Sequence, residues 1–188
     1  VIEPFVSNAA TPITDALCRE GISRAARSLW RAYENGQDAA AREDMALASL
    51  FGGLALANAK LGAVHGFAAP IGGMFPAPHG AVCARLLPLV MRTNIRAIQT
   101  REPSHPALAR YTEVARLVTG KADASADEGA EWVAHLCDAL GIAPLSKYGM
   151  DAAHLDDVAQ KSAAASSMKG NPIVLSHEEL VGILAAAL

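Results

Sequence analysis

Apolar positions recur with the spacing of α-helices along almost the whole of this chain. Between Pro12 and Tyr33 they return every three or four residues, as on one face of a helix. Thr11 is a typical N-cap before the proline, and Asn35 and Gly36 are typical of a helix end. No run alternates with the period of two that marks a β-strand. The pattern therefore predicts an all-α fold.

The next apolar segment follows a second N-cap residue, Asp38, and reaches about Leu61. It is apolar nearly all round, which predicts a buried helix. Gly52 and Gly53 within it would each cost about 1 kcal/mol relative to alanine, so we expect another backbone to approach closely there. Further helices are predicted at about Ala81–Met91, Ala107–Val118, Ala126–Leu140, Asp151–Ser166 and Glu178–Ala187, the last with the capping-box pair Ser176 and Glu179. The prediction is one domain of roughly seven or eight helices over residues 1–188.

The segment Gly62–Pro88 departs from this regular pattern because it holds two histidines, a glycine pair and several prolines. On one straight helix His65 and His79, 14 residues apart (79 − 65), would be separated by about 21 Å, too far to share a metal ion. Gly72 and Gly73, followed by prolines, favour a chain reversal, with His65 near the end of one helix and His79 at the start of the next. Two imidazoles brought together are half of a transition-metal site. A helix–turn–helix with incidental histidines is the alternative.

Composition narrows the function without naming it. The net charge of −3 and the absence of a Lys/Arg cluster give no reason to expect nucleic acid as a partner, and no apolar run is long enough to predict a membrane span. Cys18, Cys83 and Cys137 are widely spaced, which favours incidental thiols in a reducing, cytoplasmic setting. No glycine-rich phosphate loop or nucleophile elbow occurs.

Several other polar and aromatic residues are expected to be structural. The remaining histidines lie among polar neighbours, which predicts surface positions: His105, His135, His154 and His177. Asp15 and Arg19 have the i,i+4 spacing of a helical ion pair worth a few tenths of a kcal/mol. Trp30 and Trp132 lie on helical apolar stripes, so we expect them in the core.

The histidine segment resembles the second signature of the iron-containing (group III) alcohol dehydrogenases. The matching residues are His65, Gly72, Gly73, Pro78, His79, Gly80 and Pro88. Two flanking stretches, Asn8–Ile22 and Asn171–Leu180, are also similar to segments of that family. The resemblance spans essentially the whole chain.

This resemblance implies a two-domain enzyme that transfers hydride between an alcohol and NAD(P), giving an aldehyde or ketone. The N-terminal half would bind most of the NAD(P), and the C-terminal half would be an all-helical domain of the dehydroquinate-synthase-like type. Fe²⁺ or Zn²⁺ would be bound by His65 and His79 together with an Asp-x-x-x-His pair expected immediately upstream of Val1. Residues 1–188 would then be the metal-binding C-terminal domain, inactive alone. Met74 and Phe75 are candidates for the substrate pocket, and a homodimer is plausible.

One position departs from the family pattern, and other readings stay open. Many members carry a further histidine four residues after the first, where this chain has Ala69. That difference puts the usual proton route and the preference for simple primary alcohols in doubt. A zinc polyol dehydrogenase or a dehydroquinate-synthase-like lyase shares the architecture, although the segment lacks the added basic residues that a phosphate-bearing substrate requires. A catalytically silent helical module for interaction or oligomerisation is the alternative from another class.

Overall fold

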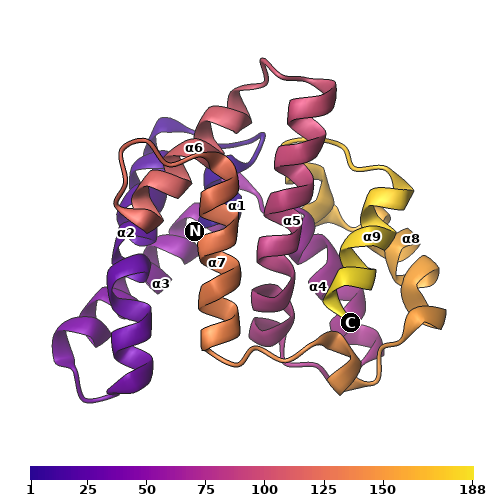
Figure 1. Cartoon of the computed structure of the whole chain (residues 1–188), viewed down its shortest axis with the longest axis horizontal. Coiled ribbons are helices and arrows are strands. Elements are labelled where there is room, and N and C mark those ends of the chain that lie inside the picture. Colours follow the sequence, from indigo (N-terminus) through magenta and orange to yellow (C-terminus); the bar gives the residue numbers. More distant parts are fainter.

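The structure is a computed structural model that describes residues 1–188, and all of its regular elements are helices (Figure 1). The α-helices are α1 (Ile2–Val6), α2 (Pro12–Glu34), α3 (Ala39–Ala59), α4 (Ala63–Met74), α5 (His79–Arg101), α6 (Pro106–Thr119), α7 (Ala126–Ala139), α8 (Leu155–Ala164) and α9 (His177–Ala187). Three short 3₁₀ helices are η1 (Leu145–Tyr148), η2 (Ala152–His154) and η3 (Ser166–Gly170). The all-α prediction is confirmed, with nine α-helices in place of the seven or eight expected.

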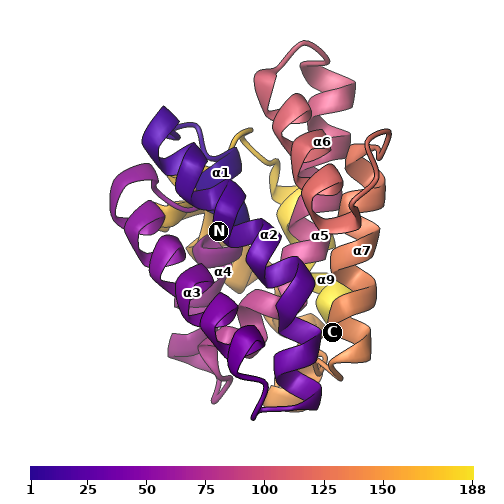
Figure 2. The same cartoon turned by 90° about the vertical axis from the view of Figure 1, so that its left-hand side faces the viewer.

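Helix α5 runs through the middle of the molecule and contacts α4, α6, α7 and α9 (Figure 1). The hairpin of α2 and α3 forms one side, and Figure 2 shows these two helices side by side with α6 and α7 beyond them. The short helix α1 lies among α2, α3 and α6. Large side chains without solvent exposure fill the core where these elements meet, among them Phe5, Phe67, Leu86, Ile95 and Leu184.

Local capping signals are confirmed where the sequence shows them. Thr11 caps α2, Asp38 caps α3, and Ser176 forms a capping box with Glu179 at the start of α9. Gly120 ends α6 in the left-handed region, with φ 72°, a backbone conformation that favours glycine. These features define the helix ends through contacts within a few residues of the chain.

One predicted helix boundary is wrong. The second apolar helix ends at Ala59, within two residues of the predicted end, and the chain then turns by 98° into a separate helix, α4. Helix α5 runs without interruption through Pro88 and extends to Arg101, well beyond the predicted end. The bend between α3 and α4 places His65 in the first turn of a helix, not near the end of one as expected.

The prediction that α3 is buried on all sides is also wrong. Leu50 and Leu54 are 55% and 44% exposed, so one apolar face of α3 is open to solvent. No backbone approaches its glycines: a Cβ at Gly53 would meet nothing within 4 Å, and one at Gly52 would touch only the Val1 side chain. The two glycines therefore have no packing role that the structure explains.

Two further expectations about side chains need correction. Asp15 is not paired with its i,i+4 neighbour but with Arg110 of α6, whose guanidinium donates two hydrogen bonds to it. Trp30 is 38% exposed and lies against Tyr33, so it is not a core residue, whereas Trp132 packs against the core. No single helix is long and apolar enough to cross a bilayer; only the sharply bent pair of α3 and α4 passes on length and composition.

Candidate metal centre

The candidate centre begins at the first turn of α4. Side chains from distant parts of the sequence cap this turn. The N-cap residue, Gly62, has no side chain to accept a hydrogen bond. Instead the Ala63 amide donates to Oδ1 of Asn171 (3.1 Å), and the Val64 amide donates to Oε1 of Glu3 (2.8 Å). A Cβ at Gly62 would lie 2.9 Å from the Glu3 carboxylate. Glycine at this position is therefore required by the close approach of the capping groups.

A buried polar network fixes the Asn171 cap. Asn171 Nδ2 donates to Oδ1 of Asn94 on α5 (2.8 Å) and to the Ile173 carbonyl (2.8 Å). Asn94 Nδ2 in turn donates to Oδ1 of Asn171 (3.0 Å) and to the Tyr111 hydroxyl (2.9 Å). No buried side-chain polar atom in the protein is left without a partner. Three segments of the chain thus meet in one satisfied network beneath the start of α4.

Glu3 also orients His65, the third residue of α4. One carboxylate oxygen accepts the Val64 amide, and the other is hydrogen bonded to Nδ1 of His65. A carboxylate on one ring nitrogen of a histidine fixes the tautomer and leaves the other nitrogen, Nε2, available to a metal ion. Glu3 itself is buried, while the His65 side chain is partly exposed. The imidazole therefore presents Nε2 outward from a rigid base.

The chain reversal predicted between the two histidines is present. Helix α4 ends at Met74, the extended residues that follow lead to Pro78, and α5 begins with His79. Gly72 and Gly73 lie within the last turn of α4, and neither has a positive φ. The expectation that these two glycines form the chain reversal is therefore wrong. The reversal brings the rings of His65 and His79 to 5.3 Å between centroids.

A cysteine whose isolated position in the sequence predicts an incidental thiol lies at the same place. Cys83 is one helical turn after His79 on α5, and its Sγ is 3.5 Å from Nε2 of His79 and 3.8 Å from Nε2 of His65. The three ligand atoms lie within 4.8 Å of one another. The i,i+4 spacing of His79 and Cys83 is the signal that could have found this residue.

These donors fit a transition metal ion. Imidazole nitrogens suit Fe²⁺ and Zn²⁺, and a thiolate favours Zn²⁺ among the common divalent ions. Hydrogen bonds with Cys83 and with the Glu3 carboxylate raise the pKa of His65 to about 9. A metal ion at Nε2 must displace that proton, so metal affinity increases with pH in this range.

An apolar cavity of about 310 Å³ opens beside these donors. His65 and Cys83 line it together with apolar side chains that include Ile2, Leu56 and Leu87. Such a mixture of an apolar wall and a few polar groups is typical of small-molecule sites.

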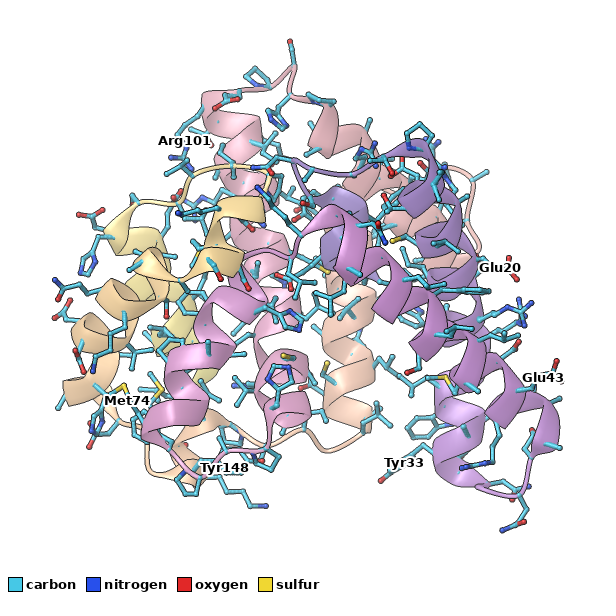
Figure 3. The ribbon with its side chains drawn as sticks, turned by 180° about the vertical axis from the view of Figure 1, so that it is seen from behind. Glu20, Tyr33, Glu43, Met74, Arg101 and Tyr148 are labelled. Carbon is cyan, nitrogen blue, oxygen red and sulfur yellow. The ribbon has the colours of Figure 1, made fainter.

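The predicted pocket residues Met74 and Phe75 lie elsewhere, at the end of α4, where Figure 3 labels Met74. Met74 accepts a hydrogen bond from Lys161, and Phe75 packs edge-on against His154. Ala69, one turn after His65 on α4, is exposed.

The other histidines are not part of this cluster. His105 caps α6 through Nδ1, and His154 and His177 are paired with Asp151 (2.8 Å) and Asp156 (3.0 Å). His135 is exposed on α7. Only His65 and His79 among the six histidines belong to a group that could hold a metal ion.

Comparisons with known proteins agree along the whole chain. Residues 1–188 match the family described as Fe-containing alcohol dehydrogenase family, C-terminal. The chain is 35% identical over 191 residues to alcohol dehydrogenase 4 of Schizosaccharomyces pombe, a match that covers 100% of this chain and 43% of the relative. It is 45% identical over 96 residues to 1,3-propanediol dehydrogenase of Klebsiella pneumoniae, covering 51% of this chain and 25% of that protein.

The fold comparison gives the same result. The alcohol dehydrogenase from Oenococcus oeni superimposes with a TM-score of 0.88 at 31% identity, covering 100% of this chain and 48% of that one. The chain thus spans less than half the length of the relatives that it matches end to end.

Proposed function

Because this chain belongs to the Fe-containing alcohol dehydrogenase family, as its C-terminal helical part, we propose that it is the metal-binding half of an NAD(P)-linked alcohol dehydrogenase. The reaction is hydride transfer between an alcohol and the nicotinamide, giving an aldehyde or ketone, and it runs in both directions. The observation that carries the proposal is the meeting of His65 and His79, with the Glu3 carboxylate behind His65.

Each residue of the centre has a distinct task in this proposal. His65 and His79 bind the divalent ion through Nε2, and Glu3 holds the His65 ring in the required tautomer. The bound ion, Fe²⁺ or Zn²⁺, supplies Lewis-acid polarisation of the alcohol or carbonyl oxygen. The apolar wall of the adjacent cavity receives the carbon chain of a small alcohol and excludes water from the reacting atoms.

The rest of the activity requires groups outside these residues. We propose that the other half of the protein binds NAD(P) and supplies the remaining ligands, an Asp-x-x-x-His pair, on the side where His79 is exposed. Ala69 offers no ring nitrogen near the centre, so the alcohol proton reaches solvent by another route. The three free thiols suit the reducing cytoplasm, where we place the reaction.

The test compares three single substitutions in the full protein that contains this chain. His65→Ala and His79→Ala should each reduce bound metal to well below one ion per chain and lower NAD(P)-dependent alcohol oxidation by about 100-fold or more, because each removes one ligand. The matched control is His135→Ala, since His135 is exposed and outside the metal-binding cluster. Metal content is measured by elemental analysis and turnover by NAD(P)H absorbance. Wild-type protein without metal and without turnover would favour the silent helical module.

A further inference from the structure

An apolar groove lies between α2 and α7. Helix α2 packs on α1, α3 and α6, whereas α7 packs on α5 and α6. Between α2 and α7 is a cavity of about 180 Å³, and all 11 residues that line it are hydrophobic. Ile22 and Leu29 of α2 line one side, Trp132 and Leu136 of α7 line the other, and Leu87 of α5 also contributes. We call this feature the α2–α7 groove.

The apolar stripe of α2 extends beyond the part that its own fold covers. Ile22, Ala26 and Leu29 recur at intervals of three or four residues, and Tyr33 follows one turn later on the same face. Ala26 and Leu29 are only partly buried, and Tyr33, which Figure 3 labels, is 61% exposed. An apolar stripe of this kind normally packs against another element. With a second apolar wall on α7, the α2–α7 groove has the form of a binding site for one more helix.

The first residue of the chain lines this groove together with Ile2. A Cβ at Gly21 would lie 2.7 Å from the Val1 side chain, so the absence of a side chain there lets Val1 approach α2 closely. Val1 is also the N-cap of α1 and gives it no side-chain cap. The first amides of a helix have no acceptor within that helix, and a preceding helical turn would supply the acceptors for α1.

The rest of a relative's length lies on the N-terminal side of the matched region. The chain matches the C-terminal part of its family and covers 43% of alcohol dehydrogenase 4 of Schizosaccharomyces pombe. In a protein built like this relative, the stretch that leads into Val1 therefore reaches the groove directly. Because it is covalently connected, its effective concentration at the groove exceeds that of a second copy of the chain.

We propose that the α2–α7 groove binds the stretch of the full protein that leads into Val1, as an apolar helix that continues α1. This inference rests on the proposed function, which places the NAD(P)-binding half outside these residues. The bound helix covers the exposed part of the α2 stripe, at Leu29 and Tyr33.

The same helix closes one side of the substrate cavity. The groove and that cavity share Val1, Ile2 and Leu87 in their walls. A helix in the groove therefore separates this side of the cavity from solvent, and it helps to exclude water from the carbon chain of the alcohol.

Thiol labelling of the full protein tests the proposal with a matched pair of positions on α2. Tyr33 and Ile13 are 61% and 76% exposed, and Ile13 lies about two and a half turns before Ile22, on the face opposite the groove. We expect Ile13→Cys to react with a maleimide as an exposed thiol does, and Tyr33→Cys to react about 10-fold more slowly or less, because its reaction requires local opening. Mass spectrometry assigns the label to each site and separates it from the native thiols.

A charge in the groove provides a second measurement. Leu29→Glu, combined with Tyr33→Cys, should restore fast labelling while the helical circular dichroism is retained, because a buried unpaired carboxylate disfavours the bound helix. The comparison of the two single variants does not depend on this combination.

The outcomes separate this inference from the proposed function. Equal labelling rates for Tyr33→Cys and Ile13→Cys would overturn the inference. Slow labelling of Tyr33→Cys that becomes fast on dilution would also overturn it, since the groove would then bind a second copy of the chain. Labelling requires neither bound metal nor turnover, so a protein that protects Tyr33→Cys but binds no metal and has no turnover overturns the proposed function alone.

Discussion

The α2–α3 hairpin and the start of α4 are both held by polar side chains, but the partners come from very different distances along the chain. In the hairpin, Asp44 of α3 accepts hydrogen bonds from Arg24, Arg27 and Ser28 of α2, 16 to 20 positions away. At α4 the side chains of Glu3 and Asn171 accept hydrogen bonds from backbone amides that are 61 and 108 positions away in the sequence. One region is a local unit, and the other exists only when the whole chain has folded.

This difference predicts which changes affect the candidate metal centre. The hydrogen bonds of Asp44 hold α2 against α3. Figure 3 labels Tyr33 and Glu43, which lie near the loop that joins the two helices. Weakening the hydrogen bonds of Asp44 should leave His65 in place. The α4 cap, by contrast, shares Glu3 with His65, so whatever displaces α1 or the segment after η3 should also displace the imidazole. We therefore expect stability and metal binding to be coupled at α4 and separate at the hairpin.

The largest effect is expected from Gly170→Ala at the end of η3. A Cβ there would overlap the Leu61 carbonyl in the bend before α4, so the backbone must shift. We expect a loss of about 3 kcal/mol in the free energy of unfolding, together with weaker metal binding. Chemical denaturation and metal titration of the same protein measure both.

Gly53→Ala is the matched control in the hairpin, since a Cβ there would meet nothing and the residue is inside α3. It should increase stability by about 0.5–1 kcal/mol and leave metal affinity unchanged. Equal effects of the two glycine substitutions would contradict the distinction between the regions.

Asn171→Ala is expected to cost about 2–3 kcal/mol. It leaves the Ala63 amide and the Asn94 side chain without their buried partners. Asn58→Ala provides the comparison, because Asn58 is exposed and bonds only to the Leu54 carbonyl of its own helix. That variant should change stability by less than about 0.5 kcal/mol. Thermal unfolding of the two variants measures the difference. If Asn171→Ala left the stability unchanged, the polar network would not be what anchors α4.

The same contrast explains how much of the fold the sequence predicts. Helix starts with a local cap, at Thr11, Asp38 and Ser176, are predictable because the cap and the amide are three residues apart. The start of α4 has only Gly62 at its N-cap. Its capping groups are remote in sequence, so the local pattern contains no signal that a new helix begins at Ala63.

The candidate site was predictable to a similar, partial extent. The chain reversal that joins His65 to His79 followed from helix geometry, because the separation along one helix would be too large. Cys83 was missed, although its i,i+4 spacing from His79 was visible, since an isolated cysteine in an apolar run is usually a core residue. Its partner His65 is on another helix, which only the fold reveals.

Glu3→Gln should weaken metal binding with little loss of stability. Glutamine can still accept the Val64 amide, but it removes the negative charge that faces Nδ1 of His65. Loss of such an outer partner reduces metal affinity by about 10-fold. Glu113→Gln is the control, because Glu113 pairs only with the exposed Arg19 far along the chain. Competition with a coloured chelator measures the metal affinity of both variants. Equal affinities would show that the Glu3 carboxylate does not strengthen metal binding by His65.

The smallest effect is expected from acid, and in the hairpin it should act through Asp44. Hydrogen bonds from Arg27 and then Ser28 hold the pKa of Asp44 well below its usual value. A carboxyl with a lowered pKa in the folded state stabilises the protein fully above the pKa of the unfolded chain, and this contribution is lost as pH falls below about 4 towards the folded pKa. Amide hydrogen exchange, corrected for the intrinsic effect of pH, should therefore show α2 and α3 losing protection below about pH 4 while the buried middle of α5, around Ile95, keeps it. Asp44→Asn should remove the part of this pH dependence that Asp44 contributes and leave the hairpin less protected at neutral pH, whereas Asp38, whose pKa is also lowered, keeps its own part. If the amides of α3 stayed protected in acid with Asp44 intact, the apolar contact with α2 would be what holds α3 in place. The hairpin and α4 would then differ only in how far apart their contacts lie in the sequence.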